Sequence, residues 1–272
     1  MFLDEDIKMI STIIVLSILI PGVWMYKPES CYDIYKDDYR NPSGNYVIFQ
    51  SDKAIPVYCS FEENYVYTFI SRKFSGTSID MKPFYSTSTF AKLRILKANG
   101  EQREVTVENL SSYQSLTDLS FNYNRHPHYQ GPINYGLRPY IFLGFLPVRL
   151  TRNYNTQGYR ASGTDFTFKN CDANPNSYLA FYLNPKLQQP TNAGYTSEFM
   201  TQWITYSTPL EFPQYMDSSL YMEWEMHLGG CGGLITSKLV SDTKAALGLP
   251  FAIPKHMNKE YGKSKIHAEK EK

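Results

Sequence analysis

The stretch from Cys31 to Arg72 constrains the fold more than any other part of this 272-residue chain. A cysteine opens it, a Pro-Ser-Gly turn at 42–44 leads into an alternating run that ends at Gln50, and Cys59 ends the next run. Alternation at period two next to such a turn is typical of β-strands. We therefore predict a hairpin-like unit closed by a Cys31–Cys59 disulfide. The alternative is two unpaired buried thiols.

Composition narrows the class of protein. Hydrophobic residues make up 42% of the chain and charged residues 19%, which favours a sizeable core over disorder. The net charge of +1 gives no electrostatic case for a nucleic-acid partner. The 23 tyrosines favour strands and wet binding surfaces. The four cysteines lack metal-site spacing, so we predict a second disulfide, Cys171–Cys231, by elimination, and no metal or other cofactor.

The N-terminus carries an apolar run from Met9 to Ile20, shorter than the roughly 20 residues that span a membrane. We predict a signal peptide over residues 1–22, secretion, and no stable membrane insertion after cleavage, with a mature start between Val23 and Ser30. The acidic residues before Lys8 are atypical of a signal peptide, and initiation at Met9 would remove them. The alternative is a type II anchor extending to Tyr26.

The rest of the chain predicts a mainly β, disulfide-stapled, β-sandwich-like domain over residues 23–254, with long loops and little helix. Asn99-Gly100 predicts a hairpin between strands at 93–96 and 105–107. Further strands are expected at 140–150, 164–169, 178–183, 201–206 and 221–227, and a short helix at 243–247. Pro-, Gly- and Asn-rich segments at 121–140 and 185–198 predict loops, and 255–272 a charged disordered tail.

Residues 31–72 resemble the opening subdomain of the fibrinogen-related family. The resemblance rests on Cys-Tyr-Asp-Ile-Tyr from Cys31, the Asn-Pro-Ser-Gly-Asn-Tyr-Val-Ile run and the strand ending at Cys59. The glycine-cysteine-glycine cluster around Cys231 is also similar to one in the GON module of some secreted metalloproteases. The resemblance implies secretion, the first disulfide and a general recognition role. Beyond Arg72 the sequence departs from the family, so its calcium and acetyl-group recognition are not carried over.

Known catalytic signatures are missing from the sequence: it has no G-x-S-x-G elbow and no H-E-x-x-H pair. His126 and His128 lie two apart and could offer two nitrogens to a metal, but exposed loop histidines are the preferred interpretation. Glu223 and Glu225 share one face of a predicted strand, where we expect solvated side chains. A hydrolase using Asp165, Glu223 or Glu225 is the least favoured functional class.

We therefore expect a secreted, non-catalytic recognition or adhesion protein that binds an extracellular glycan or protein. A structural matrix or secretion component that self-associates is the alternative, and the sequence does not fix the oligomeric state. The contact surface is predicted in the 121–140 loop, where aromatic faces, an amide, a guanidinium and imidazoles gather. Its candidate residues are Tyr123, Asn124, Arg125, His126, His128 and Tyr129. Asn109-Leu110-Ser111 is a sequon, so a glycan is expected at Asn109.

Overall fold

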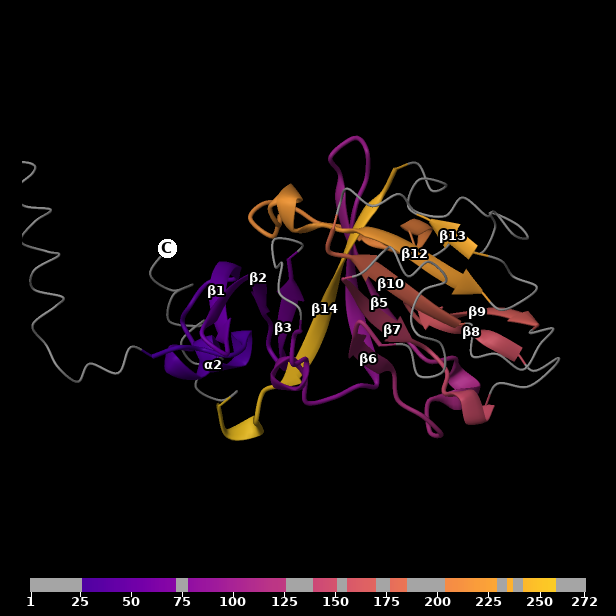
Figure 1. The fold of residues 1–272 in the computed structure, drawn as a ribbon, viewed down its shortest axis with the longest axis horizontal. Helices are drawn as coiled ribbons and strands as arrows, with labels where there is room; N and C mark the ends of the chain where they lie inside the picture. Colours follow the sequence, from indigo (N-terminus) through magenta and orange to yellow (C-terminus); the bar gives the residue numbers. More distant parts are fainter. Residues whose placement is uncertain are drawn as a thin grey trace, which may run out of the picture.

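The computed structural model describes residues 26–71, 78–125, 139–150, 156–169, 177–184, 204–228, 234–236 and 242–257. Within them the chain is mainly β, and the strands form two sheets in which every strand pair is antiparallel. Figure 1 shows the large sheet extending across the molecule and the small sheet lying against one half of it. The mainly β prediction is confirmed.

The large sheet has nine strands. In spatial order they are β1 (Gly44–Gln50), β2 (Lys53–Phe61), β3 (Tyr65–Ile70), β14 (Lys244–Ala252), β4 (Phe90–Leu96), β5 (Gln102–Glu108), β8 (Thr156–Ala161) and β9 (Thr164–Lys169), with β11 (Thr208–Pro209) paired to β5. The small sheet has five, in the order β13 (Leu234–Thr236), β12 (Glu223–Leu228), β10 (Ser177–Tyr182), β7 (Tyr140–Gly144) and β6 (Ser120–Tyr123). The strands predicted at 164–169 and 178–183 are confirmed within one residue.

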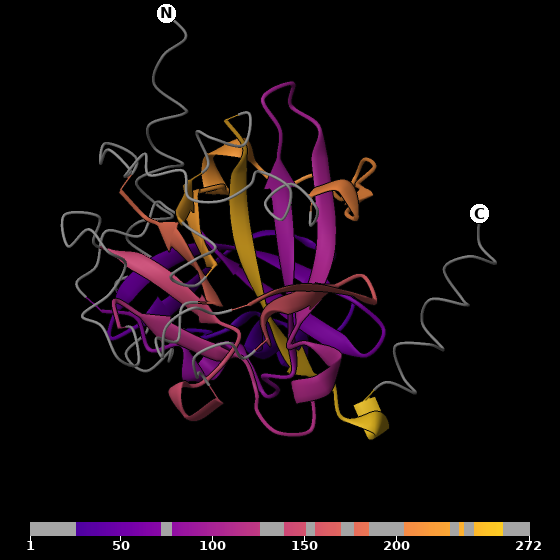
Figure 2. The ribbon, with the colours of Figure 1, turned by 90° about the vertical axis from the view of Figure 1, so that its right-hand side faces the viewer.

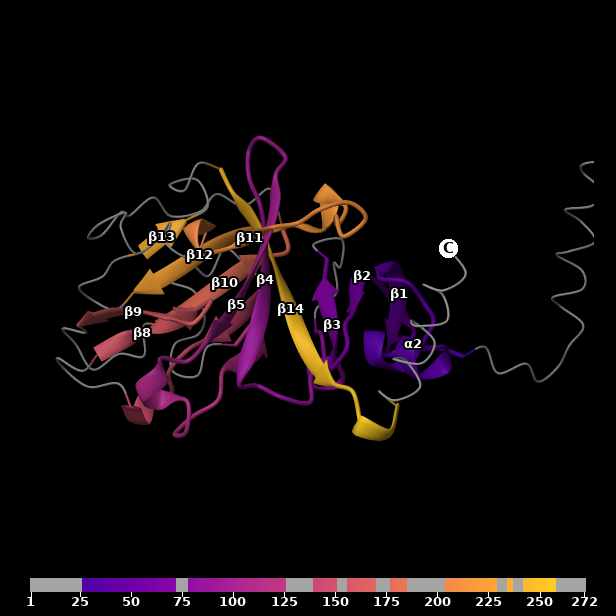
Figure 3. The ribbon, with the colours of Figure 1, turned by 180° about the vertical axis from the view of Figure 1, so that it is seen from behind.

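Strand β14, from the C-terminal part of the chain, lies between two strands from its N-terminal part. It pairs with β3 through Gly248↔Phe69 and with β4 through Leu247↔Leu93, so the strand nearest the C-terminus completes the sheet begun near the N-terminus (Figure 3). The short helix predicted at 243–247 is wrong. Tertiary pairing overrides the helix preference of the Lys-Ala-Ala-Leu run, because both neighbouring strands need their hydrogen-bonding partner.

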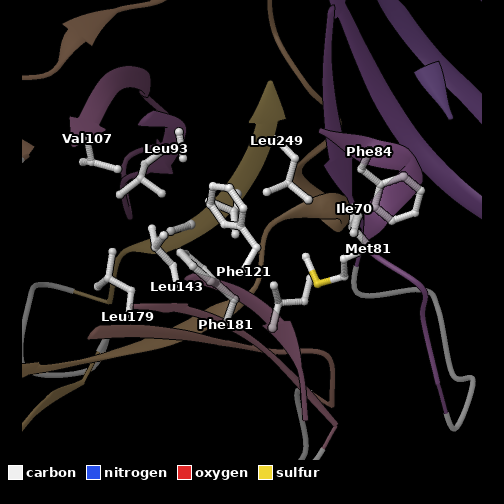
Figure 4. Close-up of a cluster of buried hydrophobic side chains, with 14 of the residues drawn as sticks. Ile70, Met81, Phe84, Leu93, Val107, Phe121, Leu143, Leu179, Phe181 and Leu249 are labelled. Atoms are coloured by element: carbon white, nitrogen blue, oxygen red, sulfur yellow. The ribbon is translucent and has the colours of Figure 1, made fainter. Parts of the chain in front are cut away.

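One hydrophobic core fills the space between the sheets. Leu93, Val107 and Leu249 of the large sheet face Leu143 and other side chains of the small sheet (Figure 4). Period-two alternation explains this, because in β4 the buried Ala91, Leu93 and Ile95 alternate with side chains on the opposite face. A second set of buried residues covers the outer face of the large sheet, including Tyr58, Tyr67, Phe69 and Tyr221.

The predicted Cys31–Cys59 disulfide is present, with Cα atoms 5.5 Å apart and both cysteines fully buried. It ties β2 to helix α2 (Cys31–Asp37), a helix that the sequence analysis missed. Ser30 caps this helix, since its hydroxyl accepts a hydrogen bond from the Asp33 backbone N–H. Cys171 and Cys231 lie outside the described residues, so their pairing stays a prediction.

Three further predictions need correction or limits. The strand expected at 201–206 is wrong in its described part, because residues 204–205 are helical. The loop expected at 121–140 is wrong at both ends, because residues 121–123 belong to β6 and Tyr140 opens β7, and residues 126–138 lie outside the described residues. The disordered tail expected from Lys255 is wrong for residues 255–257, which are helical, with Met257 packed against the core, and residues 258–272 lie outside the described residues. No helix in the described part of the chain is long and apolar enough to cross a membrane.

We predict that Gly248→Ala destabilises the protein by about 1–3 kcal/mol, because overpacking forces neighbouring groups to move. A β-carbon at Gly248 would lie 2.4 Å from Cζ of Phe69, so the Phe69 ring would have to leave its position over β14. Urea unfolding monitored by circular dichroism measures the loss. Ala252→Ser, at the exposed end of the same strand, is the control and should leave the midpoint nearly unchanged. Equal stability of Gly248→Ala and the parent would contradict this packing.

Candidate functional site

The site with the richest chemistry in the described structure is a groove on the outer face of the large sheet. It has a volume of about 480 Å³. Its floor and walls come from β2, β4 and β5 and from the segment 208–214. The lining residues are Ser43, Tyr58, Ser60, Phe61, Glu62, Lys92, Arg94, Glu104, Val105, Thr106, Ser162, Thr208, Pro209, Leu210 and Gln214. Most of these side chains are polar, although the sheet beneath them is aromatic.

Four charged side chains form one network in this groove. The Lys92 Nζ atom donates to Glu62 Oε1 at 2.5 Å and to Glu104 Oε1 at 2.7 Å. The Arg94 Nε atom donates to the other oxygen of Glu104 at 3.0 Å. Two cations therefore face two carboxylates, and the network carries no net charge.

Arg94 is almost fully buried, at 3% exposure. Its guanidinium carbon lies 4.5 Å from the Tyr58 ring centre and 4.8 Å from the Phe69 ring centre, so it contacts two aromatic rings as well as Glu104. Burial lowers the pKa of this guanidinium, but the neighbouring Glu104 carboxylate and Tyr58 hydroxyl outweigh burial and raise the pKa overall. The buried arginine therefore stays charged and keeps its hydrogen bonds.

The segment 208–217 closes one side of the groove and is fixed by polar anchors. Arg94 Nη1 donates to the Gln214 carbonyl at 3.0 Å. The Gln102 amide bonds both backbone groups of Met216, with Nε2 donating to its carbonyl at 2.7 Å and Oε1 accepting from its N–H at 2.8 Å. Tyr221 also donates to Gln102 Oε1 at 2.7 Å. In Figure 2 this orange segment lies beside the β4–β5 hairpin, as these contacts require.

The predicted contact loop has a structural role in its described part. Asn124 adopts a positive φ of 52°, and its Oδ1 accepts a hydrogen bond from the Tyr140 N–H at 2.8 Å, which joins the ends of β6 and β7. Tyr123 is half-buried against the core, and burial raises its pKa to about 12. Arg125 is exposed. The other three candidates, His126, His128 and Tyr129, lie outside the described residues.

Asn109 is buried, at 1% exposure, and its Nδ2 donates to the Thr117 carbonyl at 2.7 Å. The side chain that would carry the glycan is therefore buried and hydrogen-bonded in the folded chain. The glycan expected at this sequon stays a prediction.

The expected solvated position of Glu225 is wrong. The predicted alternation holds, with Met222, Trp224 and Met226 in the core. The opposite face is also covered, so Glu225 is fully buried beside tyrosines of β10. Tyr178 donates to Glu225 Oε1 at 3.2 Å. Burial raises the pKa of Glu225 to about 7, and the neighbouring hydroxyls of Tyr182 and Tyr178 only partly offset this.

The three carboxylates considered for hydrolysis do not form one site. Asp165 is ion-paired with Arg160 at 2.8 Å, and Glu223 lies 3.8 Å from the Lys244 ammonium. None of the three lines the groove or the second hollow, which is formed beside Ile79. Among the described residues no group of three or more His, Cys, Asp or Glu could hold a metal ion.

Sequence reasoning missed the groove, although part of its signal was present. The Asn99-Gly100 turn sets the β4–β5 register, in which Arg94 is paired with Glu104 and Lys92 with Thr106. These four residues therefore lie on the same outer face of the sheet, and the sequence alone could have predicted this. Glu62 and Gln214 reach the site only through tertiary packing.

Comparison of the chain with protein-family models, curated proteins and solved structures finds no match. The resemblance to the fibrinogen-related family and to the GON module therefore stays a prediction. The groove and its charges are the basis for a functional proposal.

We predict that Arg94→Lys lowers the free energy of unfolding by about 2 kcal/mol. Arg94 bonds Glu104 through Nε and the Gln214 carbonyl through Nη1, and a single lysine ammonium cannot occupy both of these positions. Urea unfolding measures the loss, and limited proteolysis should show earlier cleavage in 211–215. Arg160→Lys is the matched control, since its pair with Asp165 is partly exposed and contributes at most about 1 kcal/mol. Equal losses in the two variants would contradict the anchoring role of Arg94.

We predict that stability falls as the pH rises from about 4.5 to about 7. In this window the unfolded chain releases the Glu225 proton while the folded protein keeps it, so unfolding becomes easier with each increment of pH. Across the whole window the free energy of unfolding falls by about 3 kcal/mol. Below it, Glu225 is protonated in both the folded and the unfolded state, so its contribution no longer changes with pH. Urea midpoints across this range should flatten in Glu225→Gln but keep their slope in Glu223→Gln. An unchanged slope in Glu225→Gln would show that another group is responsible.

Proposed function

We propose that this protein is a secreted, non-catalytic recognition protein that binds a neutral glycan in the groove over β2, β4 and β5. The observation that carries the proposal is the internally neutralised network of Lys92, Arg94, Glu62 and Glu104 in an open polar groove. Such a network offers fixed donors and acceptors without a net charge.

Sugar hydroxyls match this arrangement because each can donate one hydrogen bond and accept others. They can donate to the carboxylates of Glu62 and Glu104 and accept from the ammonium of Lys92. A phosphate or sulfate group would meet both carboxylates, and a cationic ligand would meet Lys92 and Arg94. The balance of charge therefore favours a neutral, hydroxyl-rich ligand over an ionic one.

The groove is also suited to binding in its size and rigidity. Its volume lies in the usual range of roughly 300–1,000 Å³ for small-molecule sites. Lys92 is held by two carboxylates and lies 4.5 Å from the Tyr67 ring centre, so its position is set before a ligand arrives. Groups that are ordered in advance lose less conformational entropy on binding.

An extracellular location agrees with the buried Cys31–Cys59 disulfide, because such bonds persist in oxidising compartments. The apolar run from Met9 to Ile20, which suggests a signal peptide, lies outside the described residues. Secretion is therefore proposed on the disulfide and on the sequence.

We predict that the protein binds a subset of neutral oligosaccharides on a glycan array and that Thr106→Trp reduces this binding by more than about tenfold. Thr106 lies in β5 among the groove-lining residues, and an indole there fills the space, while tryptophan suits a strand. Array fluorescence and calorimetry with the best neutral oligosaccharide measure the change.

The matched control is Val47→Trp, at an exposed position of edge strand β1, which should bind as the parent does because neither Val47 nor its cross-strand partner Pro56 lines the groove. No binding of the parent to any neutral oligosaccharide would contradict the proposal. Equal binding by Thr106→Trp and the parent would contradict the groove as its site. Sedimentation of the parent as a large concentration-dependent assembly would favour the structural, self-associating alternative.

A further inference from the structure

Next to the groove, the segment 211–215 presents two aromatic side chains to solvent. Phe212 is 86% exposed and Tyr215 is 47% exposed. Phe212 has the greatest exposure among the large hydrophobic side chains of the described residues. Pro209, Leu210 and Gln214, which flank it in the chain, all line the groove, so the aromatic tip stands at the groove's rim.

The exposure of Phe212 is not a consequence of a loosely held segment. Leu210 N–H donates to the Gln102 carbonyl at 2.9 Å on one side of the tip. On the other side, Met216 is 1% exposed and bonded to the Gln102 amide. Within the tip, the Gln214 N–H donates to the Glu211 carbonyl at 2.8 Å. Both ends are therefore anchored, while residues 211–215 remain exposed.

A solvent-exposed phenylalanine gives up the favourable free energy that burying its ring would supply. A ligand that covers it recovers this term, and the anchored segment loses little conformational freedom in the process. The rim thus offers a flat apolar surface beside a groove of charged hydrogen-bonding groups. A ligand that suits both must have an apolar face and a polar edge.

We infer that Phe212 and Tyr215 form an aromatic wall on which one pyranose ring of a neutral oligosaccharide stacks, while the hydroxyls of that sugar or its neighbour enter the groove. A pyranose ring has the required chemistry, because its axial C–H bonds form an apolar face and its hydroxyls project from the edge. This inference rests on the proposed glycan binding and adds the part of the surface that selects for a ring-shaped ligand.

The wall also sets which ligands fit. A sugar ring with C–H bonds across one face can lie flat on an aromatic ring, whereas an acyclic polyol of the same hydroxyl content cannot. We therefore expect hexose oligosaccharides to bind and sorbitol or glycerol to compete poorly at equal hydroxyl concentration.

The test compares six proteins: the parent, Phe212→Ala, Tyr215→Ala, Phe212→Trp, the groove variant Thr106→Trp and the control Val47→Ala. Each is screened against an array of neutral hexose and N-acetylhexosamine oligosaccharides and then measured by calorimetry with the best binder. We expect Phe212→Ala to weaken binding about tenfold, which corresponds to about 1.4 kcal/mol. Tyr215→Ala should weaken it less, and Phe212→Trp should retain it. The new indole of Phe212→Trp should also change its fluorescence when the oligosaccharide is added.

Val47→Ala is the matched control, because Val47 is 46% exposed on edge strand β1 and should be indifferent to the sugar. Thr106→Trp could lose oligosaccharide binding while Phe212→Ala and Tyr215→Ala bind as the parent does. That result would contradict the aromatic wall but would support binding in the groove. Absence of binding by the parent overturns both proposals. Sedimentation with phosphatidylcholine–phosphatidylserine vesicles that requires Phe212 would assign the tip to a membrane and overturn the wall.

Discussion

The contacts of one buried guanidinium connect most of the features described above. Arg94 lies between the rings of Tyr58 and Phe69, bonds Glu104 on the neighbouring strand and holds the Gln214 carbonyl. It thereby joins β2, β3, β4 and β5 to the segment that walls the groove. A charge buried this deeply is tolerated only when its donors are satisfied, so the same contacts that stabilise the guanidinium also fix the shape of the site.

The position of Arg94 depends in turn on a strand from the far end of the chain. Phe69 can contact Arg94 because its ring lies over Gly248, where no β-carbon intervenes. Strand β14 carries Gly248 and separates β3 from β4, so residues near 60, 94, 104 and 214 meet only after this strand is in place (Figure 1). The groove is therefore a product of the complete sheet, and no single hairpin contains it.

The sequence was sufficient for features that depend on local chemistry. Alternation located β9, β10 and β12 closely, the Asn99-Gly100 turn predicted the β4–β5 hairpin, and the first disulfide followed from two cysteines flanking strands. Sequence-based prediction failed where contacts with distant parts of the chain determine the structure. The Lys-Ala-Ala-Leu run at 244–247 forms a strand because two neighbours pair with it, and Glu225 is buried because the second face of its sheet is covered. Asn124, one of the predicted contact residues, instead hydrogen-bonds Tyr140 and so joins the ends of β6 and β7.

Hydrogen–deuterium exchange of the full protein, with and without a saturating mixture of neutral hexose and N-acetylhexosamine oligosaccharides, tests the central claim most directly. The account predicts slower exchange in peptides covering 58–62, 92–94, 104–106 and 208–216, which meet at the groove and its rim. Peptides from the small sheet, including 120–125 and 177–184, should exchange as before. Protection confined to the small sheet, or none at any oligosaccharide concentration, would contradict glycan binding in this groove.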